Sequence, residues 1–237
     1  MRLHRGVRRF GGSDLLPKGY LDLRLIVSVL LAVISSQALA VPTAENIAAR
    51  VRRQWDKVND YVCEMTFTAS GPELYIGKTV VTAYYKKPGK VHFEAKEGFA
   101  VLPKDMVFVG DPFEQMGSDL SGAKVSEAKL DGAACYVIKF SPMEGERPGD
   151  VKFWVDRNRW HIIRTEMNSP DGGFVSGRIS HTKIGGKWWL PSEAKIEGKT
   201  SSRRGGPSSF TAEIKFRDYR VNSGIPESVF RSGGTAK

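Results

Sequence analysis

The chain has 237 residues, of which 41% are hydrophobic and 26% charged, and its formal net charge is +10. This length suits one domain with a sizeable apolar core. The sequence contains no coiled coil, no low-complexity segment and no repeat of fixed period, which excludes fibrous and repeat architectures, and nothing marks a second domain.

Residues 1–40 are predicted to form a secretory signal peptide. A basic region precedes the apolar run 25–34, and the small-x-small pattern Ala38-Leu39-Ala40 marks a cleavage point. The run is too short to span a bilayer as a stable helix. Cleavage after Ala40 leaves 197 residues with a net charge of +6, so we expect a periplasmic protein. Its positive charge favours anionic lipids or acidic polymers over nucleic acid, unless it is simply a solvated surface.

An amphipathic helix is predicted directly after the cleavage site. Thr43 can cap its first turn, and the helix is expected to end near Asn59. Its apolar stripe comprises Ile47, Val51, Trp55 and Val58. This stripe needs a surface to cover, and the strands that follow supply it.

Strand patterns fill the rest of the chain. In 61–68, Tyr61, Cys63, Met65 and Phe67 share one face, which predicts a half-buried strand. Further strands are expected at 79–85, 91–95, 99–102, 106–109, 124–130 and 135–140. Asp131-Gly132 is a strong tight-turn signal between the last two.

The last third reads as an antiparallel meander. Its strands are expected at 151–156, 160–167, 174–184, 188–199 and 210–221. The turns between them, such as Arg157-Asn158-Arg159 and Gly185-Gly186, are too short for parallel crossovers. A meander of about ten or eleven strands must split into two sheets or curl into a barrel or half-barrel. Its apolar residues then either fill the interior or line a cavity.

The sequence offers little that predicts catalysis. His92, His161 and His181 each stand alone in a strand, without metal-ligand spacing, and no nucleotide-binding loop or nucleophile elbow is present. We therefore predict no enzyme activity, no cofactor and no metal site; an unrecognised carboxylate pair is the remaining catalytic alternative. Cys63 and Cys135 form either one disulfide or two separate buried thiols.

Several segments resemble, in chain order, the outer-membrane lipoprotein-sorting proteins of the LolA-like superfamily. They include the strand pair around Lys87-Pro88-Gly89-Lys90, the strand Phe153-Trp154-Val155-Asp156, and the closing Gly186-Lys187-Trp188-Trp189-Leu190-Pro191 and Phe216-Arg217-Asp218-Tyr219. The basic turn Arg157-Asn158-Arg159-Trp160 departs from the family pattern "D-P-x-T-x-x-P".

The resemblance implies a mostly β (α+β) fold, in which an N-terminal helix covers the apolar cavity of a curled, unclosed antiparallel half-barrel. It also implies a periplasmic carrier for the acyl chains of lipoproteins or lipids, monomeric and served by inner- and outer-membrane protein partners. An RseB-like envelope-stress sensor, which binds a lipid-bearing ligand and a membrane partner, is the alternative. The domain is expected to cover 41–231, followed by a flexible tail at 232–237.

Apolar residues on the predicted sheet are our candidates for the cavity wall. The expected lining residues are Met65, Phe67, Phe93, Phe108 and Trp154. Phe113 and Met116 lie outside the regular strands, and we expect them to form a mobile gate.

Overall fold

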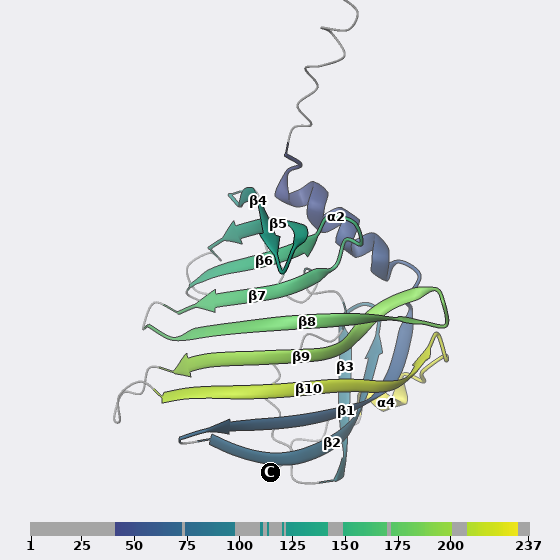
Figure 1. Ribbon diagram of the computed structural model, residues 1–237. Helices are drawn as coiled ribbons and strands as arrows, with labels where there is room; N and C mark the ends of the chain where they lie inside the picture. The colour runs from purple at the N-terminus through teal and green to yellow at the C-terminus, as the bar shows by residue number, and fades with distance from the viewer. Residues whose placement is uncertain are drawn as a thin grey trace, which may run out of the picture. The chain divides into compact units, whose positions relative to one another are not determined.

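The computed structural model describes residues 41–72, 74–97, 110, 113, 120, 122–141, 149–169, 172–200 and 208–231. The chain divides after Ala40, and every described residue belongs to the unit Val41–Lys237. Figure 1 shows one curved sheet, with the helix α2 (Ala44–Trp55) across one end and the short α4 (Ser228–Arg231) near another. The strands are β1 (Asp60–Gly71), β2 (Leu74–Lys86), β3 (Lys90–Glu97), β4 (Lys124–Leu130), β5 (Ala133–Phe140), β6 (Asp150–Asp156), β7 (Ile162–Asn168), β8 (Phe174–Ile184), β9 (Trp188–Thr200) and β10 (Ser208–Val221).

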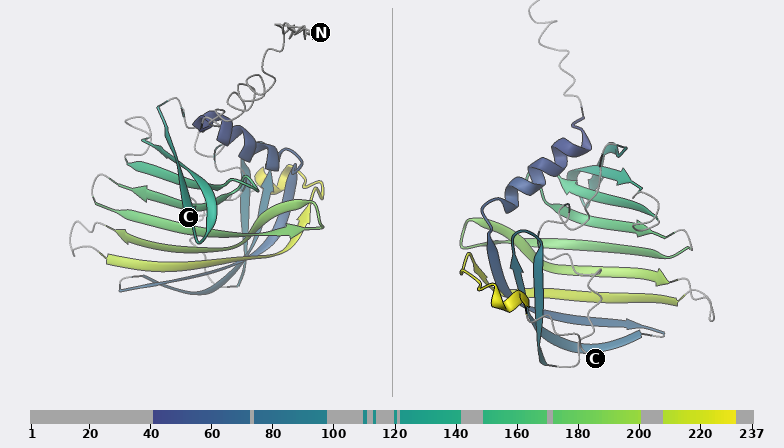
Figure 2. Two further views of the ribbon diagram at one scale, coloured as in Figure 1. Left: turned by 45° about the horizontal axis from the view of Figure 1, so that its top comes forward. Right: turned by 180° about the vertical axis from the view of Figure 1, so that it is seen from behind.

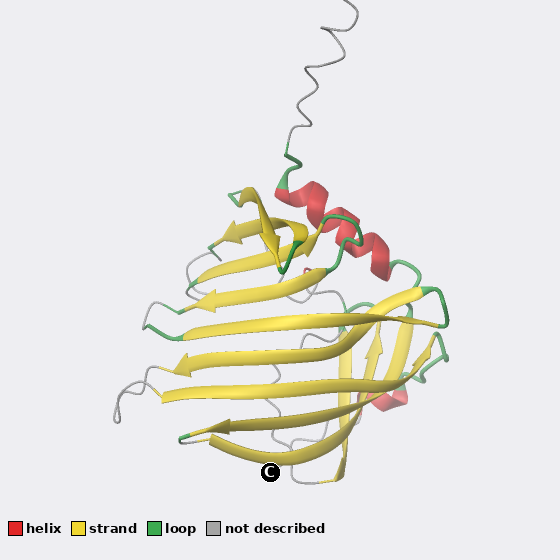
Figure 3. Ribbon diagram, in the orientation of Figure 1, coloured by secondary structure: helices red, strands yellow, loops and turns green. Residues whose placement is uncertain are grey.

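The ten strands form a single antiparallel sheet in the order β3-β2-β1-β10-β9-β8-β7-β6-β5-β4. The chain therefore runs as a meander from β4 to β10, and β1 joins this meander beside the last strand. β3 and β4 are the two edges, and they do not pair with each other, so the sheet curls without closing (Figure 3). This confirms the mostly β, unclosed half-barrel expected from the sequence.

Curvature is concentrated where the strands bulge. The pairing of β1 with β2 shifts register between Phe67 and Ala69, and that of β1 with β10 shifts between Val62 and Glu64. An extra residue in one strand bends it and increases its twist. Seen from behind, one part of β1 and of β2 runs along the long strands, and the other part bends upward beside β3 as a side wall (Figure 2). We call the face toward which the sheet curls the inner face.

α2 covers the inner face at the β4–β7 end of the sheet. Thr43 caps the helix, its hydroxyl oxygen accepting the Asn46 N–H at 3.3 Å. Ile47 and Val51 of the apolar stripe lie in one cluster with Phe153 and Val155 of β6 and with Ile138 of β5, whereas Trp55 belongs to another cluster. The helix ends at Trp55, one turn earlier than predicted, and Val58 joins a second apolar cluster on β1 and β2. Among the described residues, no helix has both the length and the apolar character needed to cross a bilayer.

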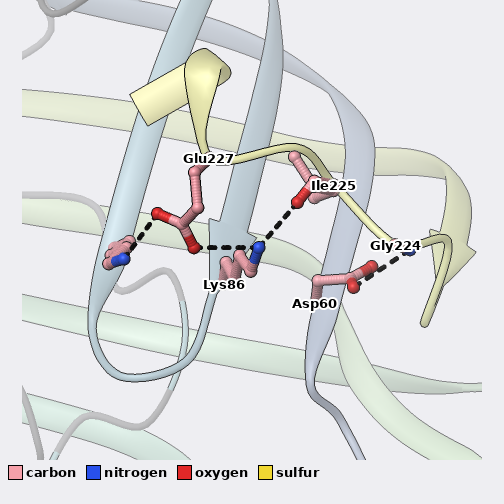
Figure 4. A network of polar contacts seen from close by, with 6 residues as sticks. Asp60, Lys86, Gly224, Ile225 and Glu227 are labelled. Carbon is pink, nitrogen blue, oxygen red and sulfur yellow. Dashed lines mark hydrogen bonds and ion pairs between the residues drawn. The ribbon is translucent and has the colours of Figure 1, made fainter. Parts of the chain in front are cut away.

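A polar clasp ties the C-terminal segment to the first strands, as Figure 4 shows. The buried Asp60 carboxylate accepts the backbone N–H groups of Ser223 and Gly224 at 2.7 and 3.1 Å. Lys86 donates to the Ile225 carbonyl at 2.7 Å and pairs with Glu227 at 2.9 Å. Lys90 pairs with Glu227 at 2.6 Å, and hydrogen bonds from Lys90 and Lys86 lower the pKa of Glu227 to about 2. The segment after β10 is therefore fixed to β1, β2 and β3.

The turn chemistry follows the sequence where the structure describes it. Asp131 and Gly132 have φ of 51° and 83°, and Gly185 and Gly186 have φ of 55° and 70°. These left-handed conformations favour Gly and are tolerated by Asp, which explains both hairpins. The strands expected at 99–102 and 106–109, the signal peptide 1–40 and the tail 232–237 lie outside the described residues.

The two cysteines are free and buried. Cys63 lies on β1 and Cys135 on β5, and five strands separate these two in the sheet order. Adjacent strands lie roughly 4.8 Å apart, whereas bridged Cα atoms lie within about 7 Å. The disulfide alternative is thereby corrected to two separate thiols.

Candidate functional site

An apolar cavity of about 200 Å³ lies between the C-terminal half of α2 and the inner faces of β7 to β10. Its described lining residues are Val51, Gln54, Trp55, Gly110, His161, Ile162, Thr165, Met167, Val175, Gly177, Ile179, His181, Trp189, Pro191, Ala194, Ile196, Ile214 and Phe216. An engineered apolar cavity of about 150 Å³ holds benzene, whereas drug-sized ligands take roughly 300–1,000 Å³. The cavity thus has room for part of one hydrocarbon chain.

Strand alternation builds this wall. In β8, Val175, Gly177 and Ile179 line the cavity, while Ser176 and Arg178 point to the other face. Small residues leave the space that larger ones would fill. A Cβ atom on Gly177 would lie 3.1 Å from Thr165 Oγ1, so this glycine lets β7 and β8 meet closely behind the cavity. Ala194 on β9 likewise contributes only a methyl group.

Two histidines stack at the cavity wall. The rings of His161 and His181 have centroids 4.1 Å apart with an interplanar angle of 25°, and His161 lies 5.9 Å from Trp189. Desolvation lowers the pKa of His161 to about 4 and that of His181 to about 3. Asp156 opposes the shift at His161, whereas Arg159 adds to it. Both imidazoles are therefore neutral at neutral pH, and the wall stays uncharged.

The sequence analysis missed this pair, because it treated each histidine as standing alone in its strand. The signal was present for His181, which continues the alternation of Val175, Gly177 and Ile179. His161 precedes β7, and its contact with His181 depends on how β7 and β8 pair. In the described residues, no group of three His, Cys, Asp or Glu side chains could hold a metal ion.

The expected lining residues lie elsewhere in the structure. Met65 and Phe67 are buried in the apolar cluster that includes the lining residues Ile196, Ile214 and Phe216, and Phe93 packs against that cluster. None of these three residues is among the described lining residues; Met65 and Phe67 pair with Phe216 and Ile214 of β10, so they lie beside the cavity wall on the same face of the sheet.

Trp154 lies on the opposite face of β6. Its neighbours Phe153 and Val155 pack beneath α2, and alternation turns Trp154 outward. There it contacts Arg164 at 5.1 Å and Lys152 at 5.9 Å, both measured to the ring centroid. Phe108 lies outside the described residues. A binding role for the five candidates remains a prediction.

Phe113 packs in the core beneath α2. Only 2% of its surface is exposed, and its ring centroid lies 5.2 Å from that of Phe153. Arg52 of α2 lies over the Phe113 ring at 5.9 Å. Met116 lies outside the described residues, so the gate formed by these two residues remains a prediction.

Arginines and aromatic rings surround the β6–β7 turn, which leads directly into the cavity residues His161 and Ile162. Arg50 of α2 lies over the Trp160 ring at 4.5 Å, and Arg159 lies over the Trp189 ring at 4.9 Å. We call Arg50, Arg159, Trp160 and Trp189 the arginine–tryptophan rim. Trp189 itself lines the cavity, so its indole ring lies between Arg159 and the apolar space.

The turn that carries the rim is held by Asp156. Its carboxylate accepts the N–H groups of Asn158 and Arg159 at 2.7 and 2.8 Å. The Trp160 N–H donates to the Asp156 carbonyl at 2.9 Å, and Trp160 adopts a φ of 55°. These bonds fix the turn, so both Arg159 and Trp160 project from a rigid support.

Several solved structures share the fold of this chain. A LolA superfamily protein from Nitrosomonas europaea superposes with a TM-score of 0.54 at 12% identity, covering 80% of this chain and 98% of that one. An outer membrane lipoprotein-sorting protein domain from Vibrio parahaemolyticus gives a TM-score of 0.55 at 11% identity, with 78% and 94% coverage. A DUF1329 family protein from Desulfovibrio piger gives 0.55 at 14% identity, also with 78% and 94% coverage.

The chain therefore has the LolA-like fold, which confirms at the level of fold the resemblance seen in its sequence. No protein-family model matches the sequence, and no curated protein is significantly similar to it. At identities this low, the likeness establishes architecture; function rests on the site.

Proposed function

We propose that this protein is a non-enzymatic periplasmic carrier that binds an acyl chain of a lipoprotein or lipid in the cavity between α2 and β7–β10. The observation that carries the proposal is the apolar, partly covered space of about 200 Å³ on the inner face. Delivery toward the outer membrane, protein partners in the two membranes and a monomeric state belong to the same proposal. The similarity of the fold to an outer membrane lipoprotein-sorting protein domain from Vibrio parahaemolyticus supports it.

The energetics suit a chain without specific polar contacts. Each methylene group moved from water to an apolar site gains about 0.8 kcal/mol. The wall of Ile162, Val175, Ile179, Ile214 and Phe216 offers no charged group to such a chain. The two histidines there are neutral because burial lowers their pKa values to about 4 and about 3. A cavity of this kind retains a hydrocarbon and accepts chains of different chemistry.

Filling the cavity tests the proposal. Ala194→Phe places a ring in the space where a chain would lie, and it should weaken binding of a fluorescent fatty acid by roughly tenfold, through loss of about two buried methylene groups. Binding is measured by fluorescence titration of the purified mature protein. The matched control is Ser180→Phe, which adds the same ring on the outer face of β8 and should bind like the wild type.

Lipid mass spectrometry of protein purified from its own envelope provides an independent measurement. The wild type should carry acyl species, and the Ala194→Phe variant should carry less. Natively folded wild type that repeatedly carries no acyl species, and that binds no fatty acid in titration, would rule out the carrier function.

A further inference from the structure

The exposed guanidinium groups of Arg50 and Arg159 lie at one end of the cavity and lack acidic partners. Neither has a carboxylate within ion-pair distance among the described residues, whereas the nearby Arg157 pairs with Glu127 at 3.0 Å. Asp156 is the acidic residue closest to Arg159 in the sequence. Its carboxylate oxygen accepts hydrogen bonds from the backbone N–H groups of the turn. Two exposed arginines against the single carboxylate of Asp156 leave this end of the cavity with a net positive charge.

Both arginines are held in place by indole rings. Arg50 lies over Trp160 at 4.5 Å and Arg159 over Trp189 at 4.9 Å. Trp160 in turn stacks on Tyr136 with ring centroids 5.8 Å apart and an interplanar angle of 25°. A guanidinium over a ring face keeps the N–H groups at its edge available for a carboxylate or phosphate. Holding the side chains in this way reduces the entropy lost when an anion binds.

The charge of Arg159 reaches the cavity wall. After desolvation, which lowers the pKa of His161 most, the Asp156 carboxylate raises this pKa and the Arg159 guanidinium lowers it by a smaller amount. His161 is itself neutral at neutral pH and does not add a positive charge. An anion at this end would therefore meet the arginines, while the hydrocarbon attached to it would meet only apolar side chains and neutral rings.

We propose that Arg50 and Arg159 form a head-group subsite, and that the ligand of the cavity is an anionic amphiphile whose phosphate or carboxylate lies at the arginine–tryptophan rim. This inference rests on the proposed function, because it names the chemical class of the chain-bearing ligand. It distinguishes the rim from a generally basic surface: the two arginines act together with the cavity and not apart from it.

The test compares ligands that share one chain and differ in the head group. Dodecyl phosphate, dodecanoate and dodecanol are titrated into the purified mature protein at neutral pH and low salt, with calorimetry as the readout and tryptophan fluorescence as a second one. We expect both anions to bind about tenfold more tightly than dodecanol, since charge-assisted hydrogen bonds add to chain burial. Added salt should reduce this preference and leave dodecanol binding unchanged or stronger.

Variants assign the preference to the rim. Arg50→Gln/Arg159→Gln should bind all three ligands with the affinity of dodecanol. Arg50→Lys/Arg159→Lys keeps the charge but loses the planar edge, and it should retain part of the preference. Arg217→Gln removes an exposed arginine from the outer face of β10 and should behave like the wild type. Circular dichroism confirms that each variant is folded.

The outcomes separate the two levels of the proposal. Equal binding of all three ligands to the wild type, or a preference that survives the double Gln variant, overturns the head-group subsite and leaves the carrier function standing. Binding of none of them overturns both. Inorganic phosphate alone should neither bind measurably nor compete; arginine-dependent binding of free phosphate as tight as that of dodecyl phosphate would overturn the amphiphile as the ligand.

Discussion

The stacked imidazoles of His161 and His181 make folding stability sensitive to pH. Burial lowers the pKa of His161 from 6.5 to about 4, and that of His181 to about 3. In the unfolded chain both imidazoles bind a proton as the pH falls below 6.5. In the folded chain they bind it only near pH 4 for His161 and pH 3 for His181. Full stability is present above the unfolded value and is lost as the pH falls through this window.

We expect the free energy of unfolding to fall by roughly 3 kcal/mol between neutral pH and the lower end of that window for His161 alone. Urea denaturation at several pH values measures the slope. The double variant His161→Gln/His181→Gln should flatten it, because neither side chain then titrates. His92→Gln, on β3 outside the described cavity, is the control and should keep the wild-type slope. An unchanged slope in the double variant would contradict the assignment to this pair.

Single residues also show what the sequence could and could not reveal. Alternation placed Tyr61, Cys63, Met65 and Phe67 on one buried face, and all four are buried. The same rule applied to β6 groups Trp154 with Lys152, away from Phe153, although Trp154 was predicted to line the cavity. Which inner-face residues leave a space depends on side-chain packing between strands, and composition does not encode that directly.

Among the elements, α4 and the segment before it depend most on the clasp. Ser223 donates to Asp60 through both its N–H and its hydroxyl, at 2.7 and 3.2 Å, and Gly224 adds a third donor. Asn222 extends the contact, since its side chain accepts the Asn59 N–H and donates to the Lys57 carbonyl. The pKa of Glu227 is lowered from 4.5 to about 2. The stability that its ion pairs contribute is therefore fully present above pH 4.5 and is lost as the pH falls toward 2.

Asp60→Asn should lower the free energy of unfolding by about 2 kcal/mol, because an amide cannot accept from all three donors and leaves a backbone N–H unsatisfied. Urea denaturation at neutral pH gives the value. Asp218→Asn is the matched control: Asp218 is exposed, and its φ of 54° is one that Asn adopts readily, so little change is expected. Equal losses in the two variants would argue against the clasp.

The sequence predicted individual helices, strands and turns better than it predicted how they pair or pack. The turns at Asp131-Gly132 and Arg157-Asn158-Arg159, and the helix start at Thr43, lie where they were expected. Strand pairing was harder to predict: among the described strands, β1 pairs with β10, and the consecutive strands β3 and β4 lie at opposite edges of the sheet. No sequence pattern within 60–71 or 208–221 indicates that these two segments, far apart in the chain, pair with each other. Loop length alone also permits several registers between β7 and β8, and these decide whether His161 meets His181.

Across the whole molecule, the sheet keeps its two thiols far apart. Cys63 is packed among the residues of β1 and β2, and burial raises its pKa to about 12. Burial also raises the pKa of Cys135 on β5, whose thiol donates to the Ala128 carbonyl at 3.4 Å. Both groups therefore remain protonated at neutral pH, and the thiolate is the reactive form.

We expect Ellman's reagent to detect two thiols per chain in denaturant without prior reduction, and to react far more slowly with the native protein. The count comes from absorbance on protein purified under non-reducing conditions. The Cys63→Ser variant should give one thiol per chain in denaturant. Detection of no thiols in the wild type before reduction, and of two afterwards, would show a disulfide and contradict the arrangement of the sheet.

The seam between β1 and β10 has a consequence for biogenesis. The hairpin of β1 and β2 is synthesised early, yet Phe216 of β10, which pairs with Met65, lies about 150 positions further along the chain. Until β10 has been synthesised, one edge of β1 has unpaired backbone N–H and C=O groups, which can pair with another chain and lead to aggregation. We expect a fragment that ends before residue 208 to aggregate and not to form a smaller folded domain, because β1 then has no β10 to pair with.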